Sequence, residues 1–111
     1  MLKRVRKALD DSDVISNPDC TVATIAEICA DSARNVSQVI NESYGNTFTA
    51  VLTEARIREV ARRISDSAVY DNFTIEAIGL DIGFRSRGGF VRAFKRHTGM
   101  TPSEYLALAK E

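Results

Sequence analysis

The chain has 111 residues, of which 44% are apolar, and its 15 basic and 15 acidic side chains cancel in net charge. That is one domain's worth of sequence, with enough apolar material for a modest core and no room for a second domain. No apolar run approaches the roughly 18 residues of a membrane-spanning helix, and the basic N-terminus lacks the apolar tract of a signal peptide. We therefore expect a soluble, cytoplasmic protein.

The cysteine and histidine content excludes several kinds of site. Cys20 and Cys29 lie nine positions apart and His97 is the only histidine, so neither a zinc-ligand pattern nor a disulfide framework is present. The segment around Ser86 lacks the G-x-S-x-G spacing of a nucleophile turn, and no phosphate-binding loop signature occurs. We predict no enzyme activity, no metal and no cofactor.

Helical patterns run through the whole chain. Period-two alternation is absent, and only Pro18 and Pro102 interrupt the helical spacing of apolar residues. The first helix runs from Leu2 to about Ser12, and a polar loop then extends to about Cys20. The pattern predicts an all-α fold of seven helices.

A helix-turn-helix is predicted next. Thr21 offers an N-cap for a helix to about Ala30, and Ser32 caps a second helix that runs to Tyr44 and stops at Gly45. This second helix shows a face of short, hydrogen-bonding side chains that suits base edges and phosphates, although an ordinary solvated face is the alternative for this segment alone. The face comprises Ala33, Arg34, Ser37, Gln38 and Asn41.

One long helix is predicted from Thr47 to about Asp66, and its apolar pattern is unusual. At about 100° per residue, its apolar residues change sides between Ala55 and Ile57. A helix that packs in a single core keeps its apolar residues on one side. A change of side is expected when the two halves of the helix pack on two small bundles. Its length of roughly 30 Å is close to the roughly 34–36 Å between successive major-groove faces of DNA. The two sides carry Phe48, Val51, Leu52 and Ala55, then Ile57, Val60, Ala61 and Ile64.

A second helix-turn-helix follows a predicted loop around Tyr70. Thr74 can cap a helix that runs to about Ile82, and Gly83 and Phe84 make a turn one residue longer than that of the first unit. A second candidate recognition helix then begins after a serine and ends at a glycine, as in the first unit. Its outward basic residues are Arg87, Arg92, Lys95 and Arg96.

A last helix follows the second unit. Thr101 provides a hydroxyl cap, Pro102 occupies the first helical position, and Glu104 takes the capping-box position. This arrangement predicts a well-capped helix N-terminus.

The two units are copies of one pattern, because five residues of the first recur in the second at a constant offset of 54 positions. The pairs are Ser32 with Ser86, Val36 with Phe90, Ile40 with Phe94, Gly45 with Gly99, and Thr47 with Thr101. Two helix-turn-helix units in one chain predict a protein that reads two successive turns of a DNA groove.

The zero net charge argues at first sight against a nucleic-acid partner, because phosphates require an excess of Lys and Arg. The basic residues are, however, unevenly distributed. Residues 85–96 include five basic side chains and no acid, and residues 3–7 include four basic side chains. A charge cluster can be a solvated face, and for the N-terminal cluster this explanation is as good as DNA binding. In the second candidate recognition helix the basic residues stand where a groove would be read.

The framework of the second unit consists of Ile78, Gly83, Phe84, Ser86, Phe90, Arg92, Phe94, Lys95, Gly99, Thr101, Pro102 and Tyr105. The segment that contains these residues resembles the second helix-turn-helix of the AraC/XylS family of bacterial transcription regulators. The first unit, with Arg56 and Ala61 after it, resembles the family's first helix-turn-helix and linker. The resemblance implies binding to double-stranded DNA, with RNA polymerase as a further partner to consider. Family members typically carry a separate sensor or dimerisation domain, so we expect a fragment or a small stand-alone member.

The resemblance also implies positions for DNA contacts. Base contacts would come from Arg34, Ser37, Gln38, Arg87, Gly88, Gly89 and Arg92. From their positions on or beside the two recognition helices, we also expect phosphate contacts from Ser32, Asn41, Ser86, Lys95 and Arg96. Gly88 and Gly89 depart from the family pattern, which has larger residues there, and two helical glycines cost about 2 kcal/mol relative to alanine. Gly79 is a milder departure, since alanine is usual at its position.

We predict one DNA-binding domain with a first helix-turn-helix subdomain (1–46), a linker helix (47–66) and a second helix-turn-helix subdomain (67–111). Its predicted function is sequence-specific binding of double-stranded DNA in the regulation of transcription. One alternative is a protein-interaction module that docks a protein of the transcription machinery or a sensor. Another, an RNA binder, rests only on the Arg-Gly-Gly triplet at Arg87, which is neither repeated nor in a disordered segment. Binding that weakens steeply with salt would distinguish DNA from an apolar protein partner.

Overall fold

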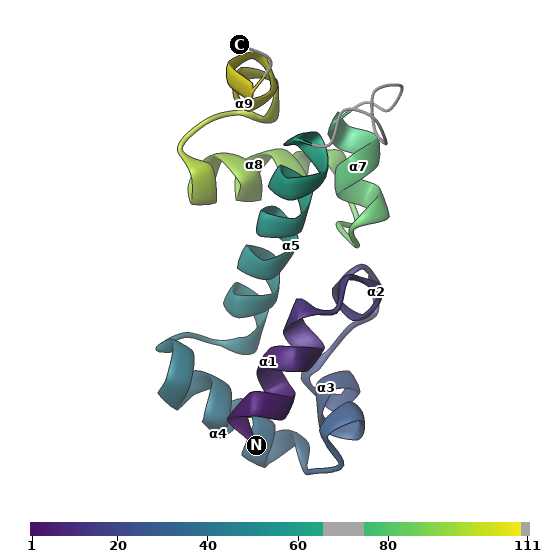
Figure 1. Ribbon diagram of the computed structural model, residues 1–111, viewed down its shortest axis with the longest axis vertical. Coiled ribbons are helices and arrows are strands. Elements are labelled where there is room, and N and C mark those ends of the chain that lie inside the picture. The colour runs from purple at the N-terminus through teal and green to yellow at the C-terminus, as the bar shows by residue number, and fades with distance from the viewer. Residues whose placement is uncertain (66–74, 110–111) are drawn as a thin grey trace.

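The computed structural model describes residues 1–65 and 75–109, and every regular element in these ranges is a helix (Figure 1). In chain order the helices are α1 (Leu2–Asp10), α2 (Ser12–Ile15), α3 (Val22–Cys29), α4 (Ala33–Tyr44), α5 (Phe48–Ser65), α7 (Ile75–Asp81), α8 (Arg87–Thr98) and α9 (Pro102–Ala109). The all-α prediction is confirmed. The predicted cap Thr74 and the predicted loop at Tyr70 lie outside the described residues.

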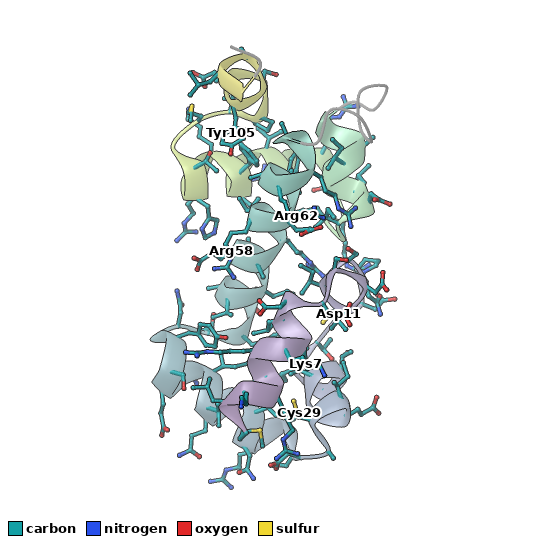
Figure 2. The ribbon with its side chains drawn as sticks, viewed as in Figure 1. Lys7, Asp11, Cys29, Arg58, Arg62 and Tyr105 are labelled. Atoms are coloured by element: carbon teal, nitrogen blue, oxygen red, sulfur yellow. The ribbon has the colours of Figure 1, made fainter. Side chains whose placement is uncertain are left out.

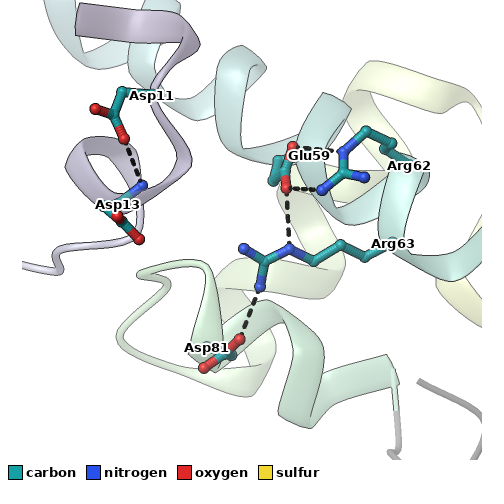
Figure 3. Close-up of polar contacts among 6 residues, drawn as sticks. All are labelled: Asp11, Asp13, Glu59, Arg62, Arg63 and Asp81. Atoms are coloured by element: carbon teal, nitrogen blue, oxygen red, sulfur yellow. Dashed lines mark hydrogen bonds and ion pairs between the residues drawn. The ribbon is translucent and has the colours of Figure 1, made fainter. Parts of the chain in front are cut away.

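Helix α2 is the element that the sequence does not predict. Its four residues lie in the expected polar loop, so the described ranges contain eight helices where seven are predicted for the whole chain. The Asp11 side chain caps α2 by accepting a hydrogen bond from the backbone N–H of Asp13 at 2.9 Å (Figure 3). Ile15 anchors the turn in the core. A helix of one turn is too short to show apolar periodicity, so its Asp and Ser residues read as a loop.

The two candidate recognition helices begin and end as predicted. Ser32 and Ser86 each accept a hydrogen bond at 3.1 Å from the backbone N–H three residues further along. Helices α4 and α8 end at Gly45 and Gly99, whose φ angles of 66° and 79° lie in the left-handed region that favours glycine. The two helices therefore have the same length of 12 residues and the same type of cap at each end.

The turns that precede α4 and α8 share one hydrogen-bonding pattern. In each turn a left-handed residue, Ala30 (φ 55°) or Gly83 (φ 109°), follows the helix. The N–H of the next residue donates to the carbonyl five positions earlier, at 3.0 Å in the first unit and 3.1 Å in the second, which closes the helix end. Arg85 then separates this closure from Ser86, whereas no residue intervenes in the first unit. The prediction of a turn one residue longer is confirmed.

Helix α5 joins two separate hydrophobic cores, one formed with α1–α4 and the other with α7, α8 and α9 (Figure 1). The first core contains Val5, Ala8, Leu9, Ile15, Cys20, Ile25, Ala26, Cys29, Val36, Ile40, Val51, Leu52 and Ala55. The second contains Ile57, Val60, Ile64, Ile78, Ile82, Phe90 and Phe94. The predicted change of apolar face between Ala55 and Ile57 is confirmed. Because the cores lie end to end, the molecule measures 43 × 24 × 23 Å.

Gly79 on α7 is required by the size of Phe90 on α8. A Cβ atom placed on Gly79 would lie 2.6 Å from the Phe90 ring, closer than real Cβ contacts. The equivalent residues of the first unit are Ala26 and Val36. Ala26 is larger than Gly79, and Val36 is smaller than Phe90. The glycine therefore compensates for the phenylalanine.

Arg63 of α5 forms an ion pair within its own helix and another with α7. Arg63 donates from Nε to Oε1 of Glu59 at 3.0 Å and from Nη1 to Oδ2 of Asp81 at 2.8 Å (Figure 3). Hydrogen bonds from Arg62 lower the pKa of the Glu59 carboxyl, and Arg63 acts in the same direction, although partial burial opposes both. The Glu59 carboxylate is therefore ionised at neutral pH.

We expect Glu59→Gln to destabilise the fold at neutral pH and to have little effect in acid. Because the folded-state pKa lies below the ordinary 4.5, the carboxylate contributes fully above pH 4.5 and loses its contribution as pH falls through the lower folded value. Thermal unfolding of both proteins at about pH 7 and about pH 3 measures this difference. Glu54→Gln is the control, because the Glu54 side chain is exposed and pairs with Arg58 at 3.7 Å. An equal cost of Glu59→Gln at both pH values would contradict the expectation.

Candidate nucleic-acid interface

Two grooves flank the first half of α5. The first groove, of about 560 Å³, lies between α5, α4 and the start of α3, and the second, of about 750 Å³, lies between α5 and α8. Thr47, Thr49 and Thr53 line both grooves and form a threonine ridge between the two candidate recognition helices. The grooves and the ridge thus make one continuous surface that extends from α4 to α8.

Helix α4 contributes its predicted residues to this surface in two ways. Ser37 and Asn41 line the first groove, whereas Arg34 and Gln38 are exposed. The Gln38 amide donates from Nε2 to Oε1 of Glu42 at 3.1 Å. This exposed hydrogen bond occupies one of the two N–H donors of the Gln38 amide, and the other donor and the carbonyl oxygen can contact a base. The sequence prediction missed Glu42 as a partner, although its spacing of four residues from Gln38 places it on the same helix face.

Asp31 places a negative charge at the start of α4. Its carboxylate accepts hydrogen bonds from Asn35 Nδ2 at 2.9 Å and from the Ser32 backbone N–H at 2.7 Å. These hydrogen bonds lower the pKa of the Asp31 carboxyl, so it stays ionised near Ser32. In the second unit Arg87 directly follows the serine cap and no acidic residue adjoins it, while Arg85 before the cap pairs with Asp19. The start of α8 is therefore more favourable for a phosphate than the start of α4.

Helix α8 contributes a basic face without an acidic residue. Arg92 and Arg96 line the second groove together with His97, a residue to which the sequence prediction gave no role. The remaining predicted contact residues of α8 are exposed, except Gly89, which is half-buried. Positive charge on this surface is therefore concentrated at the second unit.

Gly88→Ala should stabilise the free domain by up to about 1 kcal/mol, because alanine favours helix over glycine. A Cβ there would meet only the end of the Arg92 side chain, at 3.3 Å. Since Arg87 and Arg92 flank this turn, we expect its backbone to approach DNA closely, and the added methyl group then also weakens binding. Thermal unfolding and a binding titration measure the two effects, and a higher Tm with unchanged affinity would contradict close approach. Gly89 is less suitable, because its Cβ would lie 2.9 Å from Ser86 Oγ.

Comparison with protein families identifies the class of this domain. Residues 25–107 match a family model described as a helix-turn-helix domain. The chain belongs to this family, and its helix-turn-helix is of the AraC type. The resemblance seen in the sequence is confirmed. Within the described ranges, no helix has the length and apolar character needed to span a membrane.

The curated relatives are longer bacterial proteins. The RCS-specific HTH-type transcriptional activator RclR of Escherichia coli K12 is 32% identical over 85 residues, which cover 77% of this chain and 28% of that protein. The HTH-type transcriptional regulator RipA of Corynebacterium glutamicum is 31% identical over 94 residues, covering 83% of this chain and 27% of that protein. The chain thus spans less than a third of the length of these relatives.

Solved structures share the fold. A DNA-binding transcriptional dual regulator from Escherichia coli K-12 aligns with a TM-score of 0.81 at 25% identity, over 98% of this chain and 91% of that one. The C-terminal domain of AraT, a response regulator from Geobacillus stearothermophilus, aligns with a TM-score of 0.79 at 24% identity, over 96% and 84%. The arrangement of two helix-turn-helix units on one long helix is therefore shared with these proteins.

Proposed function

We propose that this chain is the DNA-binding domain of a bacterial transcription regulator and binds specific sequences of double-stranded DNA. Its two recognition helices, α4 and α8, would enter successive major-groove faces on one side of the duplex. The pairing of these helices carries the proposal: they have equal length and caps, and each packs on one half of α5. With 18 residues, α5 is about 27 Å long, which is of the same order as the roughly 34 Å repeat of the groove.

The exposed side chains divide into two proposed roles. Contacts with base edges would read the sequence, whereas contacts with phosphates would position the domain on the DNA backbone. The proposed base contacts are Arg34, Ser37, Gln38, Arg87, Gly88, Gly89 and Arg92. The proposed phosphate contacts are Ser32, Asn41, Ser86, Lys95 and Arg96. Asp31 makes the Ser32 contact the weakest of these.

The proposal keeps the division into a first subdomain (1–46), a linker helix (47–66) and a second subdomain (67–111). The role is non-enzymatic and belongs in the cytoplasm, where bacterial DNA is found. RclR is named a transcriptional activator, and RNA polymerase is the enzyme of transcription. We therefore propose RNA polymerase, and a sensor or dimerisation domain, as partners beyond DNA.

Salt dependence tests the proposal against a protein-interaction module. DNA binding should weaken steeply with salt, because each phosphate contact releases counterions, and the slope of log K against log salt should lie between about −2 and −5. The double variant Lys95→Ala/Arg96→Ala should reduce that slope by about 2, since each phosphate contact contributes about 1. Fluorescence anisotropy with a labelled duplex measures both slopes. No binding to any duplex at low salt would refute the proposal.

A further inference from the structure

The two halves of the molecule also touch directly, where the loop between α2 and α3 meets the turn between α7 and α8 (Figure 1). Arg56 projects from α5 into this contact. Its Nε donates to the Ile15 carbonyl at 2.7 Å and its Nη2 to the Asn17 carbonyl at 2.8 Å. Its guanidinium carbon lies 6.0 Å from the centre of the Phe84 ring. One side chain of α5 therefore contacts the loop of the first half and the turn of the second.

A second arginine crosses the same contact. Arg85, in the turn of the second half, donates to the Pro18 carbonyl at 3.0 Å and pairs with the Asp19 carboxylate. The backbones also approach closely, because a Cβ placed on Gly83 would lie 2.9 Å from the Ser16 carbonyl oxygen. We call Arg56, Arg85 and their partners in residues 15–19 the latch.

The latch lies beside the boundary between the two cores on α5. The first core ends at Ala55 and the second begins at Ile57, so Arg56 occupies the position at which the helix passes from one core to the other. Long helices curve gently, and contacts on one side of α5 at this boundary restrict that curvature. The Arg85–Asp19 pair is exposed, so its contribution to overall stability is small. The position of this pair between the two halves suits it to control their relative orientation.

We propose that Arg56 and Arg85 are positioning residues that fix the angle between α4 and α8, and thereby select the separation of the two half-sites in DNA. This proposal rests on the proposed function. With the latch in place, the two helices are held ready for one spacing. Without it, fewer molecules have the competent arrangement, and the apparent affinity falls in proportion to that fraction. The loosened molecule also accommodates other spacings more easily.

The test compares Arg56→Lys/Arg85→Ala with the wild-type chain on three duplexes. One carries the preferred site, and the others carry one base pair more or fewer between the half-sites. Lysine keeps the charge of Arg56 but cannot donate to two carbonyls as a planar fork does. We expect the double variant to lose about tenfold in affinity on the preferred site. This loss corresponds to about a tenth of the molecules having the arrangement that can bind. We also expect a smaller ratio of affinities between the preferred and altered spacings.

Arg58→Ala is the matched control. Arg58 lies on the same helix, about 200° around the axis from Arg56 at about 100° per residue. It projects away from α2 and pairs with Glu54 at 3.7 Å (Figure 2). We expect this variant to keep the wild-type preference for spacing.

A measurement without DNA separates the latch from DNA binding. Residual dipolar couplings report the relative orientation of the two halves, so one alignment tensor should fit both in the wild type and in Arg58→Ala. The double variant should require two tensors of different magnitude. A single tensor with an unchanged spacing ratio would overturn the latch. Failure of every protein to bind DNA would refute the proposed function, and the couplings would still decide on the latch.

Discussion

Inserting two alanines between Ala55 and Arg56 should reduce the affinity for a two-part DNA site to that of a single helix-turn-helix unit. The insertion rotates the second half by about 200° and lengthens α5 by about 3 Å, so α4 and α8 can no longer face one side of a duplex together. Each half keeps its own core, because among the described residues the buried clusters lie on either side of the insertion point. Since linking two binding units raises affinity by about 10²–10⁴, we expect a loss of about a hundredfold or more.

The control for this experiment changes α5 without changing its register. Glu54→Ala/Arg58→Ala replaces two exposed residues near the insertion point and should leave affinity close to the wild-type value. Circular dichroism and thermal unfolding establish that the insertion variant is folded, and a binding titration measures the loss. Full affinity of the folded insertion variant for the original site would show that α5 does not set the register of the two units.

Arg92→Ala should weaken specific binding by about 1–3 kcal/mol and relax the preference at one base position. Arg92 is exposed near the middle of α8 and lines the second groove, where its guanidinium can form two hydrogen bonds with one guanine. Lys95→Ala should weaken binding to all sequences alike, because a phosphate contact carries no base information. Selection of bound sequences with each variant compares their base profiles. An unchanged profile with Arg92→Ala would show that Arg92 does not read a base.

Local features of this fold were predictable from the sequence because they depend on near neighbours. Ser32 and Ser86 cap helices through bonds to residues three positions away, and glycines end the same helices. The change of face between Ala55 and Ile57 was predictable because helical periodicity places each side chain by its position alone. These features determine the two units, their order and the helix that joins them.

Contacts between distant residues were not predictable in the same way. The hydrogen bond from Arg85 to the Pro18 carbonyl joins residues 67 positions apart, and that from Arg56 to Asn17 joins residues 39 apart. No local pattern marks a backbone carbonyl as the partner of an arginine, and the short α2 that positions this loop has no periodicity of its own. The fit of Gly79 beneath Phe90 likewise depends on the packing of two helices. The candidate base contacts stay predictions from the positions of these residues on α4 and α8.

Selection of bound sequences from a library of random duplexes tests the central claim most directly. If α4 and α8 read successive major-groove faces, the selected sites will contain two conserved blocks whose centres lie about 10–10.5 base pairs apart. The block read by α8 should lose definition with Arg92→Ala, while the other block is unchanged. A single conserved block, or two blocks at no fixed separation, would contradict simultaneous reading by both helices.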